Sequence, residues 1–316
     1  MNYYPVYIPT LNRYEHLKRC VESLASNLHA DKTELVIGID YPPSPKYEEG
    51  YNRIKEYVKG IKGFGKLTVF EHDHNLGPSE NWYYCERYCL DNYDACIGSE
   101  DDNEFSPCFL DFMNKALMKY ENDESIESIS GWSPDYFSKQ QEYGCYLYFA
   151  SNAWGVGRWK SKEIDILNKI NGNDFVISSL KKWSLAKEML LECPKRLNNE
   201  LDMINENADW GDVKRGCYLQ VNHMCQLRPC LSLVRNHGND GTGLHCKKDD
   251  SFARQAISSA KEFNIECKVA EVNSKLVNGH RFLNLPQNII LKIGFYLVII
   301  VKYVMFRIKI ILGLLK

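Results

Sequence analysis

The stretch GSEDDN, Gly98–Asn103, follows a short apolar run and places Glu100, Asp101 and Asp102 next to one another. Adjacent carboxylates repel, so a cation among them stabilises the cluster. Oxygen ligands suit hard ions such as Mg²⁺ or Mn²⁺, which often keep coordination positions for substrate phosphates. A solvated acidic turn before a helix is the simpler alternative. Because the cluster follows three earlier strand-like segments that each end in a polar loop, we favour the metal site.

Short apolar segments alternate with helical stretches upstream of this cluster. The expected strands are Tyr4–Pro9, Leu35–Ile39, Leu67–Phe70 and Ala95–Gly98. The expected helices are Tyr14–Leu28, Pro45–Gly60 and Pro78–Leu90. This alternation predicts βαβ units, and therefore an α/β fold with a mainly parallel central sheet flanked by helices. Ligands of such sheets gather at the carboxyl ends of the strands, so the four polar loops predict one cleft.

Composition excludes several other classes of protein. The chain has 39 basic and 41 acidic residues, with a net charge of −2, which does not suit binding to nucleic acid by phosphate neutralisation. Its twelve cysteines show no paired CxxC spacing, and the opening MNYYPVYIPTLNR lacks the apolar core of a signal peptide. We therefore expect reduced thiols in the cytoplasm and no disulfide framework.

The last segment, Asn288–Lys316, is almost entirely apolar and is interrupted by basic residues. Lys302, Lys309 and Lys316 recur every seven residues and so share one face of a helix. The pattern predicts an amphipathic helix in the membrane interface, with its basic residues on anionic head groups. A tilted spanning helix and a buried core or dimer helix are the alternatives. We expect a catalytic domain over residues 1–285 that folds without a membrane-associating helix over 286–316.

Taken together, PVYIPTLNR, Asp40, HNLGPSENW, GSEDDN and ADWGD resemble the GT-A-fold glycosyltransferases, and their order resembles that of the inverting family 2 enzymes. The EDD triplet with a later DW pair is also similar to N-acetylglucosaminyltransferase I and its bacterial relatives. The resemblance covers roughly residues 3–250. It implies the nucleotide-diphospho-sugar transferase fold, with the C-terminal amphipathic helix added to it.

The resemblance also implies roles for particular residues. Those expected to contact the nucleotide sugar are Thr10, Arg13, Asp40, Asn81, Glu100 and Asp101. Among them, Asp40 would accept hydrogen bonds from the base, Asn81 would lie beside the ribose and phosphates, and Asp101 would contact the ribose. A divalent metal, Mn²⁺ or Mg²⁺, would bind Asp102, and His245 is a further candidate ligand. The alternative is that His245 only stabilises its own glycine-rich loop, which is the more common role for such a histidine.

The general base implied by the family is Asp209, just before Trp210. Relatives often have two adjacent acids at this point, whereas this chain has Asp209-Trp-Gly-Asp212, so Asp209 and Asp212 are both candidates. From the residues alone, Asp209 equally suits the N-cap of a short helix. The aromatic residues Trp154 and Trp159 suit either an acceptor platform or core packing.

These features predict a metal-dependent inverting glycosyltransferase. A cation would neutralise the diphosphate leaving group, and a carboxylate on a separate segment would take the proton of the attacking hydroxyl. The donor would be a nucleotide sugar, most simply a UDP-sugar. The acceptor would be a glycan or lipid-linked glycan at the cytoplasmic face of the membrane, in surface polysaccharide biosynthesis. The alternatives are a nucleotidyltransferase of related fold, or an inactive membrane-attached scaffold.

Overall fold

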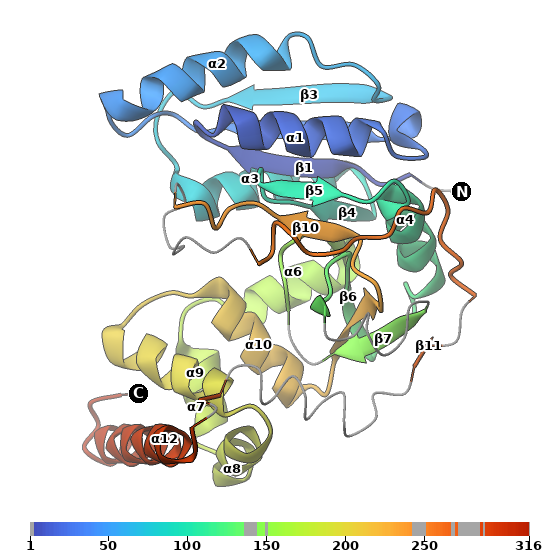
Figure 1. The fold of residues 1–316 in the computed structure, drawn as a ribbon. Coiled ribbons are helices and arrows are strands. Elements are labelled where there is room, and N and C mark those ends of the chain that lie inside the picture. Colours follow the sequence, from blue (N-terminus) through green and yellow to red (C-terminus); the bar gives the residue numbers. More distant parts are fainter. Residues whose placement is uncertain are drawn as a thin grey trace. The chain divides into compact units, whose positions relative to one another are not determined.

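The predicted βαβ alternation is confirmed in the computed structural model (Figure 1). The structure describes residues 3–135, 144–148, 151–241, 251–266, 269–270, 285–286 and 288–315. The chain divides into two compact units. The first unit comprises residues 1–147, 152–161 and 227–270, and the second comprises residues 148–151, 162–226 and 271–316.

The first unit is built on a mixed, mainly parallel sheet. Over the described part of the chain it has nine strands in the order β11-β7-β9-β6-β8-β4-β1-β2-β3. The strands are β1 (Val6–Thr10), β2 (Glu34–Ile39), β3 (Lys66–Glu71), β4 (Ala95–Gly98), β6 (Ile126–Ser130), β7 (Cys145–Tyr148), β8 (Val156–Trp159), β9 (Cys225–Pro229) and β11 (Val269–Ala270). Strands β1 to β4 are parallel, whereas β8 runs antiparallel to β4 and β6.

Helices cover both faces of this sheet. They are α1 (Tyr14–Ala25), α2 (Glu48–Val58), α3 (Gly77–Asn92) and α4 (Phe109–Lys119), with short 3₁₀ turns η1 (Ala30–Lys32) and η2 (Pro45–Tyr47). Side chains alternate across a strand, so Ile8 and Ile37 pack on one face against α1, α2 and α4. Tyr7 and Val36 pack on the opposite face against Cys85 of α3. The α/β class and the four N-terminal strands are therefore as predicted.

A second, two-stranded sheet lies next to the acidic cluster. Strand β5 (Asn103–Phe105) begins directly after Asp102 and pairs antiparallel with β10 (Val234–Asn236). The register sets Asn236 opposite Asn103. A segment more than a hundred residues downstream is thereby brought to the acidic cluster.

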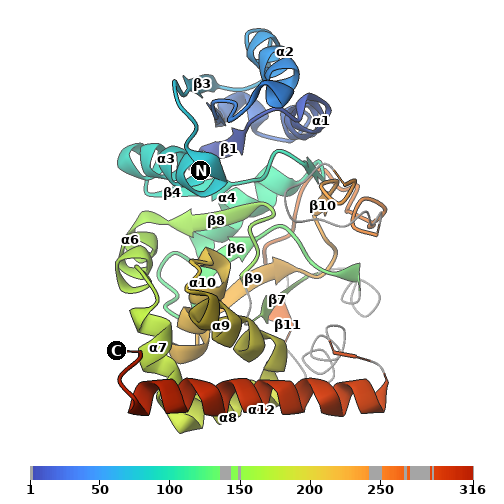
Figure 2. The same ribbon diagram turned by 90° about the vertical axis from the view of Figure 1, so that its left-hand side faces the viewer.

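The second unit is helical. Its helices are α6 (Lys160–Lys169, whose first two residues belong to the first unit), α7 (Asp174–Leu180), α8 (Trp183–Glu192), α9 (Pro194–Glu206), α10 (Gly211–Val221) and α12 (Ile289–Ile311). Figure 2 shows α12 running beside α8 and α9. The predicted C-terminal helix is thus present.

Helix α12 belongs to the core of the second unit, which differs from the expected division of the chain at residue 286. Ile299, Tyr303 and Phe306 share one face of the helix and are buried with residues of α7, α9 and α10. The Tyr303 hydroxyl also donates to the carbonyl of Leu180 at 3.0 Å. Removing α12 would expose this core, and the folding of residues 1–285 without the helix stays a prediction.

Candidate active site

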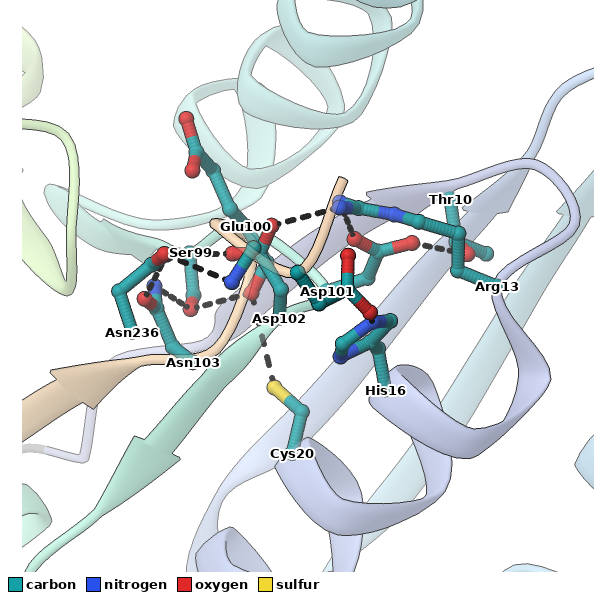
Figure 3. Close-up of polar contacts among 12 residues, drawn as sticks. Thr10, Arg13, His16, Cys20, Ser99, Glu100, Asp101, Asp102, Asn103 and Asn236 are labelled. Atoms are coloured by element: carbon teal, nitrogen blue, oxygen red, sulfur yellow. Dashed lines mark hydrogen bonds and ion pairs between the residues drawn. The ribbon is translucent and has the colours of Figure 1, made fainter. Parts of the chain in front are cut away.

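The carboxyl ends of β1, β2 and β4 lie at one edge of the sheet. Parallel pairing aligns Thr10 at the end of β1 with Ile39 at the end of β2, and Tyr7 of β1 with Gly98 at the end of β4. The loops after these strand ends therefore meet. Figure 3 shows Thr10, Arg13 and the acidic cluster together at this edge.

Arg13 is the cation of the acidic cluster. Its Nη1 contacts Asp102 Oδ2 at 2.8 Å, and its Nη2 donates to Asp101 Oδ1. The Thr10 hydroxyl donates to the other oxygen of Asp101 at 2.7 Å. Burial by itself lowers the pKa of Arg13, but the two carboxylates outweigh it and raise that pKa above its ordinary value. Arg13 therefore balances the charge of Asp101 and Asp102 in this structure, and the divalent metal at Asp102 stays a prediction.

Asp102 is held from the opposite direction by β10. Asn236 Nδ2 donates to Asp102 Oδ1 at 2.5 Å, and the His237 amide donates to the Asp102 carbonyl at 2.8 Å. Gly238 passes so close that a Cβ there would clash with Asp102 Oδ2, which accounts for glycine at this position. Sequence reasoning missed Asn236. The RNHG stretch that contains it was the available signal, but nothing local indicates its partner.

The Glu100 side chain points away from those of Asp101 and Asp102 (Figure 3). Trp154 Nε1 donates to Glu100 Oε2 at 3.1 Å, and the Trp154 ring packs edge-on against Trp132 and Phe252. Burial, followed by the charge of Asp102, raises the pKa of Glu100 to about 8. Trp159, the other candidate for an acceptor platform, is buried and donates to the Leu117 carbonyl, so it belongs to the core.

Asp40 follows β2 and holds the loop before α3. Its Oδ1 accepts from the amides of Tyr41 and Leu76 at 2.9 and 2.8 Å. Its Oδ2 accepts from the Gly77 amide and Asn75 Nδ2 at 2.9 and 3.0 Å. Four donors fill the capacity of a carboxylate, so a nucleotide base would have to replace one of them. Recognition of the base by Asp40 stays a prediction.

Asn81 of α3 is buried beneath the same edge. Its Nδ2 donates to the Gly38 carbonyl at 2.9 Å, and its Oδ1 lies 3.1 Å from His72 Nε2. A Cβ at Gly38 would clash with Asn81 Oδ1, so the helix approaches the strand closely only because glycine is present. Asn81 therefore positions the strand ends in this structure. A contact with ribose or phosphate stays a prediction.

The candidate bases belong to the second unit. Helix α10 begins at Gly211 with Trp210 as its N-cap, so the alternative that Asp209 caps this helix is wrong. Asp209 is exposed and pairs with Lys214 at 2.5 Å. Asp212 is exposed in the first turn of α10. His245 lies outside the described residues, and its role as a metal ligand stays a prediction.

The residues at the strand edge fit a divalent ion that is completed by a substrate. Asp102 supplies a hard carboxylate oxygen, and the pair of acids already holds a cation, the Arg13 guanidinium. Within the described ranges, no group of three or more His, Cys, Asp or Glu side chains forms a cage for a metal. One or two carboxylates with substrate phosphates are the usual ligands of Mg²⁺ in enzymes that act on phosphates. A metal that binds Asp102 together with a diphosphate therefore suits this donor set.

Comparison with known families decides the family. The profile described as Glycosyl transferase family 2 matches residues 6–166, about half of the 316-residue chain. The chain belongs to glycosyl transferase family 2. The match contains β1 to β4, the acidic cluster and α3, which are the elements that form the edge described above. No curated protein sequence matches the chain.

Several solved structures are similar to part of this family 2 chain. The mannosyltransferase PcManGT from Pyrobaculum calidifontis, in complex with GDP-Man and Mn²⁺, is 13% identical over 53% of this chain and 46% of its own, with a TM-score of 0.36. TarS 1–349 from S. aureus is 14% identical over 52% of this chain and 50% of its own, with a TM-score of 0.34. TarS 1–349 in complex with UDP-GlcNAc is 14% identical over 52% of this chain and 48% of its own, with a TM-score of 0.35. The chain spans about half the length of each of these proteins.

Proposed function

We propose that this family 2 chain is a metal-dependent, inverting glycosyltransferase that uses a nucleotide sugar, most simply a UDP-sugar. The observation that supports the proposal is the convergence of Thr10, Arg13, Asp101 and Asp102 at the carboxyl ends of parallel strands. When bound there, a divalent ion would neutralise charge on the diphosphate leaving group. Asp102 would hold that ion through Oδ2.

The remaining steps involve the acceptor and one of the two candidate acids, Asp209 and Asp212. The acceptor hydroxyl attacks the anomeric carbon while the bond from that carbon to the diphosphate breaks, so the configuration inverts. Asp209 or Asp212 takes the hydroxyl proton as general base. Lys214 Nζ contacts Asp209 Oδ1 at 2.5 Å and so orients the carboxylate. The other oxygen, Oδ2, is then the one that would take the proton.

We further propose that the chain works at the cytoplasmic face of a membrane through α12. The outward face of this helix consists of exposed apolar side chains: Ile290, Ile293, Leu297, Val298, Ile300, Val301, Val304, Met305, Ile308 and Ile311. By length and composition the helix could cross a membrane, with a mean hydropathy of 2.2. A lipid-linked glycan acceptor of surface polysaccharide biosynthesis suits an enzyme held there.

Lys302 and Lys309 of α12 contact α9, which differs from the predicted contact of these lysines with head groups, and Lys316 lies outside the described residues. Lys302 Nζ contacts Asp202 at 2.5 Å and Asn198 at 2.8 Å, and Lys309 Nζ donates to Asn205 at 2.7 Å. Attraction between apolar surface and lipid, rather than charge, therefore supports binding. Because these contacts tie α12 to the polar helix α9, a flat orientation is favoured over a spanning one.

The catalytic proposal is tested by incubating the purified chain with a panel of nucleotide sugars, with and without Mn²⁺, and measuring hydrolysis or transfer. We expect metal-dependent turnover of one donor, and inversion at the anomeric carbon detected by NMR. Asp102→Asn should abolish this turnover, whereas Asp31→Asn, a matched change at an exposed acid, should leave it unchanged. No turnover with any donor, acceptor and metal would contradict the proposal.

Membrane binding is tested separately by flotation with vesicles. We expect the chain to float with neutral phosphatidylcholine vesicles, and Val301→Glu with Val304→Glu to prevent it. Lys187→Glu on the exposed side of α8 serves as a control for the added charge. Flotation only with anionic vesicles, lost in high salt, would contradict the apolar mode.

A further inference from the structure

Arg13 connects the rim of the site to its two buried acids. Its side chain is 23% exposed, whereas the side chains of Asp101 and Asp102 are 5% and 6% exposed. It stands at the N-cap position of α1, and the α1 backbone makes no side-chain capping bond with it. The guanidinium is therefore committed to the two carboxylates rather than to the helix.

The four oxygens of these carboxylates divide into two kinds. One oxygen of each carboxylate accepts a hydrogen bond from a buried side chain. The Thr10 hydroxyl donates to Asp101 Oδ2, and Asn236 Nδ2 donates to Asp102 Oδ1. The other oxygen of each, Asp101 Oδ1 and Asp102 Oδ2, is held by Arg13. Two buried carboxylates side by side are costly without a cation, so Arg13 stabilises the cluster as its counter-ion.

A divalent ion bound by Asp102 comes next to the oxygen that Arg13 holds. Asp102 Oδ1 accepts from the buried Asn236 at 2.5 Å, whereas Oδ2 faces the partly exposed Arg13, so we take Oδ2 as the ligand atom. A guanidinium and a divalent cation repel each other strongly at such separations. The ion and Arg13 therefore compete for Asp102 Oδ2.

We infer that Arg13 is an exchangeable counter-ion: it occupies Asp102 Oδ2 in the free protein, gives up that oxygen to the metal, and then pairs with the diphosphate of the donor. The inference rests on the proposed function for the identity of the donor. The planar fork of arginine matches the oxygens of a phosphate as well as those of a carboxylate. The exchange makes metal binding weak without nucleotide diphosphate and stronger with it, because only the diphosphate offers the displaced guanidinium a new anion.

The test is a titration of the full chain with Mn²⁺, followed by electron paramagnetic resonance of the free ion, first alone and then with UDP. Removing the competitor in Arg13→Gln should tighten binding of Mn²⁺ alone by about tenfold and weaken UDP binding at saturating Mn²⁺ by about tenfold, a coupling of ordinary size. Arg13→Lys keeps a cation and should stay near the wild-type value for Mn²⁺. Arg19→Gln, an exposed change on the same helix, controls for the lost charge.

Arg13→Gln also lacks the counter-ion of two buried acids, so its stability needs a separate measurement. We expect a lower Tm than wild type without metal and a larger rise in Tm on adding Mn²⁺. The exchange is overturned if wild type and Arg13→Gln bind Mn²⁺ with equal affinity, or if Arg19→Gln changes that affinity as much as Arg13→Gln does. In that case, binding of UDP and Mn²⁺ to wild type leaves the proposed function standing. Absence of Mn²⁺ binding to every variant, with or without UDP, overturns both.

Discussion

In the first unit, Asp101 and Asp102 are buried, and their oxygens contact Arg13, Thr10 and Asn236. In the second unit, Glu200 of α9 is fully buried, and its neighbour is the thiol of Cys217, which is a weak hydrogen-bond donor. Burial raises the pKa of Glu200 to about 8, although the charge of Arg196 acts in the opposite direction. The two regions treat a buried acid differently. The first holds Asp101 and Asp102 against the Arg13 guanidinium, which opposes the effect of burial on the pKa of Asp101, although that pKa is still raised. In the second, burial dominates and favours the neutral form of Glu200.

The largest expected effect lies in the first region. Asp102→Asn keeps the shape of the side chain and removes the charge that a divalent ion needs. We expect turnover with Mn²⁺ to fall by about 10³-fold or more, equivalent to roughly 4 kcal/mol of transition-state stabilisation. Steady-state kinetics at saturating donor measure this. Activity within a few-fold of wild type would remove Asp102 from the metal site.

A second prediction concerns the exposed acids of the second unit. If Asp209 is the base, Asp209→Asn should lower kcat by about 10²- to 10⁴-fold with little change in donor affinity. Asp212→Asn, three residues away on α10, is the matched control. A large loss in Asp212→Asn with a near-normal rate in Asp209→Asn would transfer the role of base to Asp212.

Glu200 gives a prediction for stability and pH. Its folded pKa of about 8 lies above the ordinary value of 4.5, so its favourable contribution is complete below pH 4.5 and is lost as pH rises toward 8. Glu200→Gln removes this titration and should stabilise the protein at pH 8.5 by roughly 2–4 kcal/mol, since each pKa unit corresponds to about 1.4 kcal/mol.

Thermal unfolding of wild type and Glu200→Gln at pH 5, 7 and 8.5 checks this expectation. The difference in Tm should grow with pH. A constant difference across the three pH values would show that Glu200 has an ordinary pKa in the folded chain, and the contrast between the two regions would fail.

The smallest expected effect comes from the partly exposed pair of α12 and α9. The side chains of Lys302 and Asp202 are 34% and 28% exposed. Because such pairs are screened by water, a double-mutant cycle with Lys302→Met and Asp202→Asn should give a coupling of about 1 kcal/mol or less. A coupling of several kcal/mol would mean that Lys302 and Asp202 behave as a buried ion pair, like the acids of the first unit with Arg13.

The sequence predicts the strand edge well because its signals are local. Apolar runs that end at Thr10, Ile39 and Gly98 give the strands, and their parallel order brings the polar loops together. The contacts of Asn236 with Asp102 and of Trp154 with Glu100 join segments that are 134 and 54 residues apart. No local pattern specifies such pairs, so the second set of contacts at the site required the structure.

The C-terminal helix shows a different limit. Its apolar content and length are plain in the sequence, and the helix forms where expected. The heptad spacing of its lysines gives one face but not the direction in which that face points. Lys302 and Lys309 reach Asp202 and Asn205 because α9 offers oxygens at matching positions, which only the packing of the two helices determines.

The central claim, a divalent ion held by Asp102 against a nucleotide diphosphate, is tested most directly by anomalous diffraction at the manganese edge from crystals grown with UDP and Mn²⁺. The account predicts one anomalous peak bonded to the Asp102 carboxylate and to the diphosphate, with Arg13 turned from Asp102 toward the phosphates. A diphosphate bound at the strand edge with manganese absent from Asp102, or manganese bound elsewhere, would contradict it.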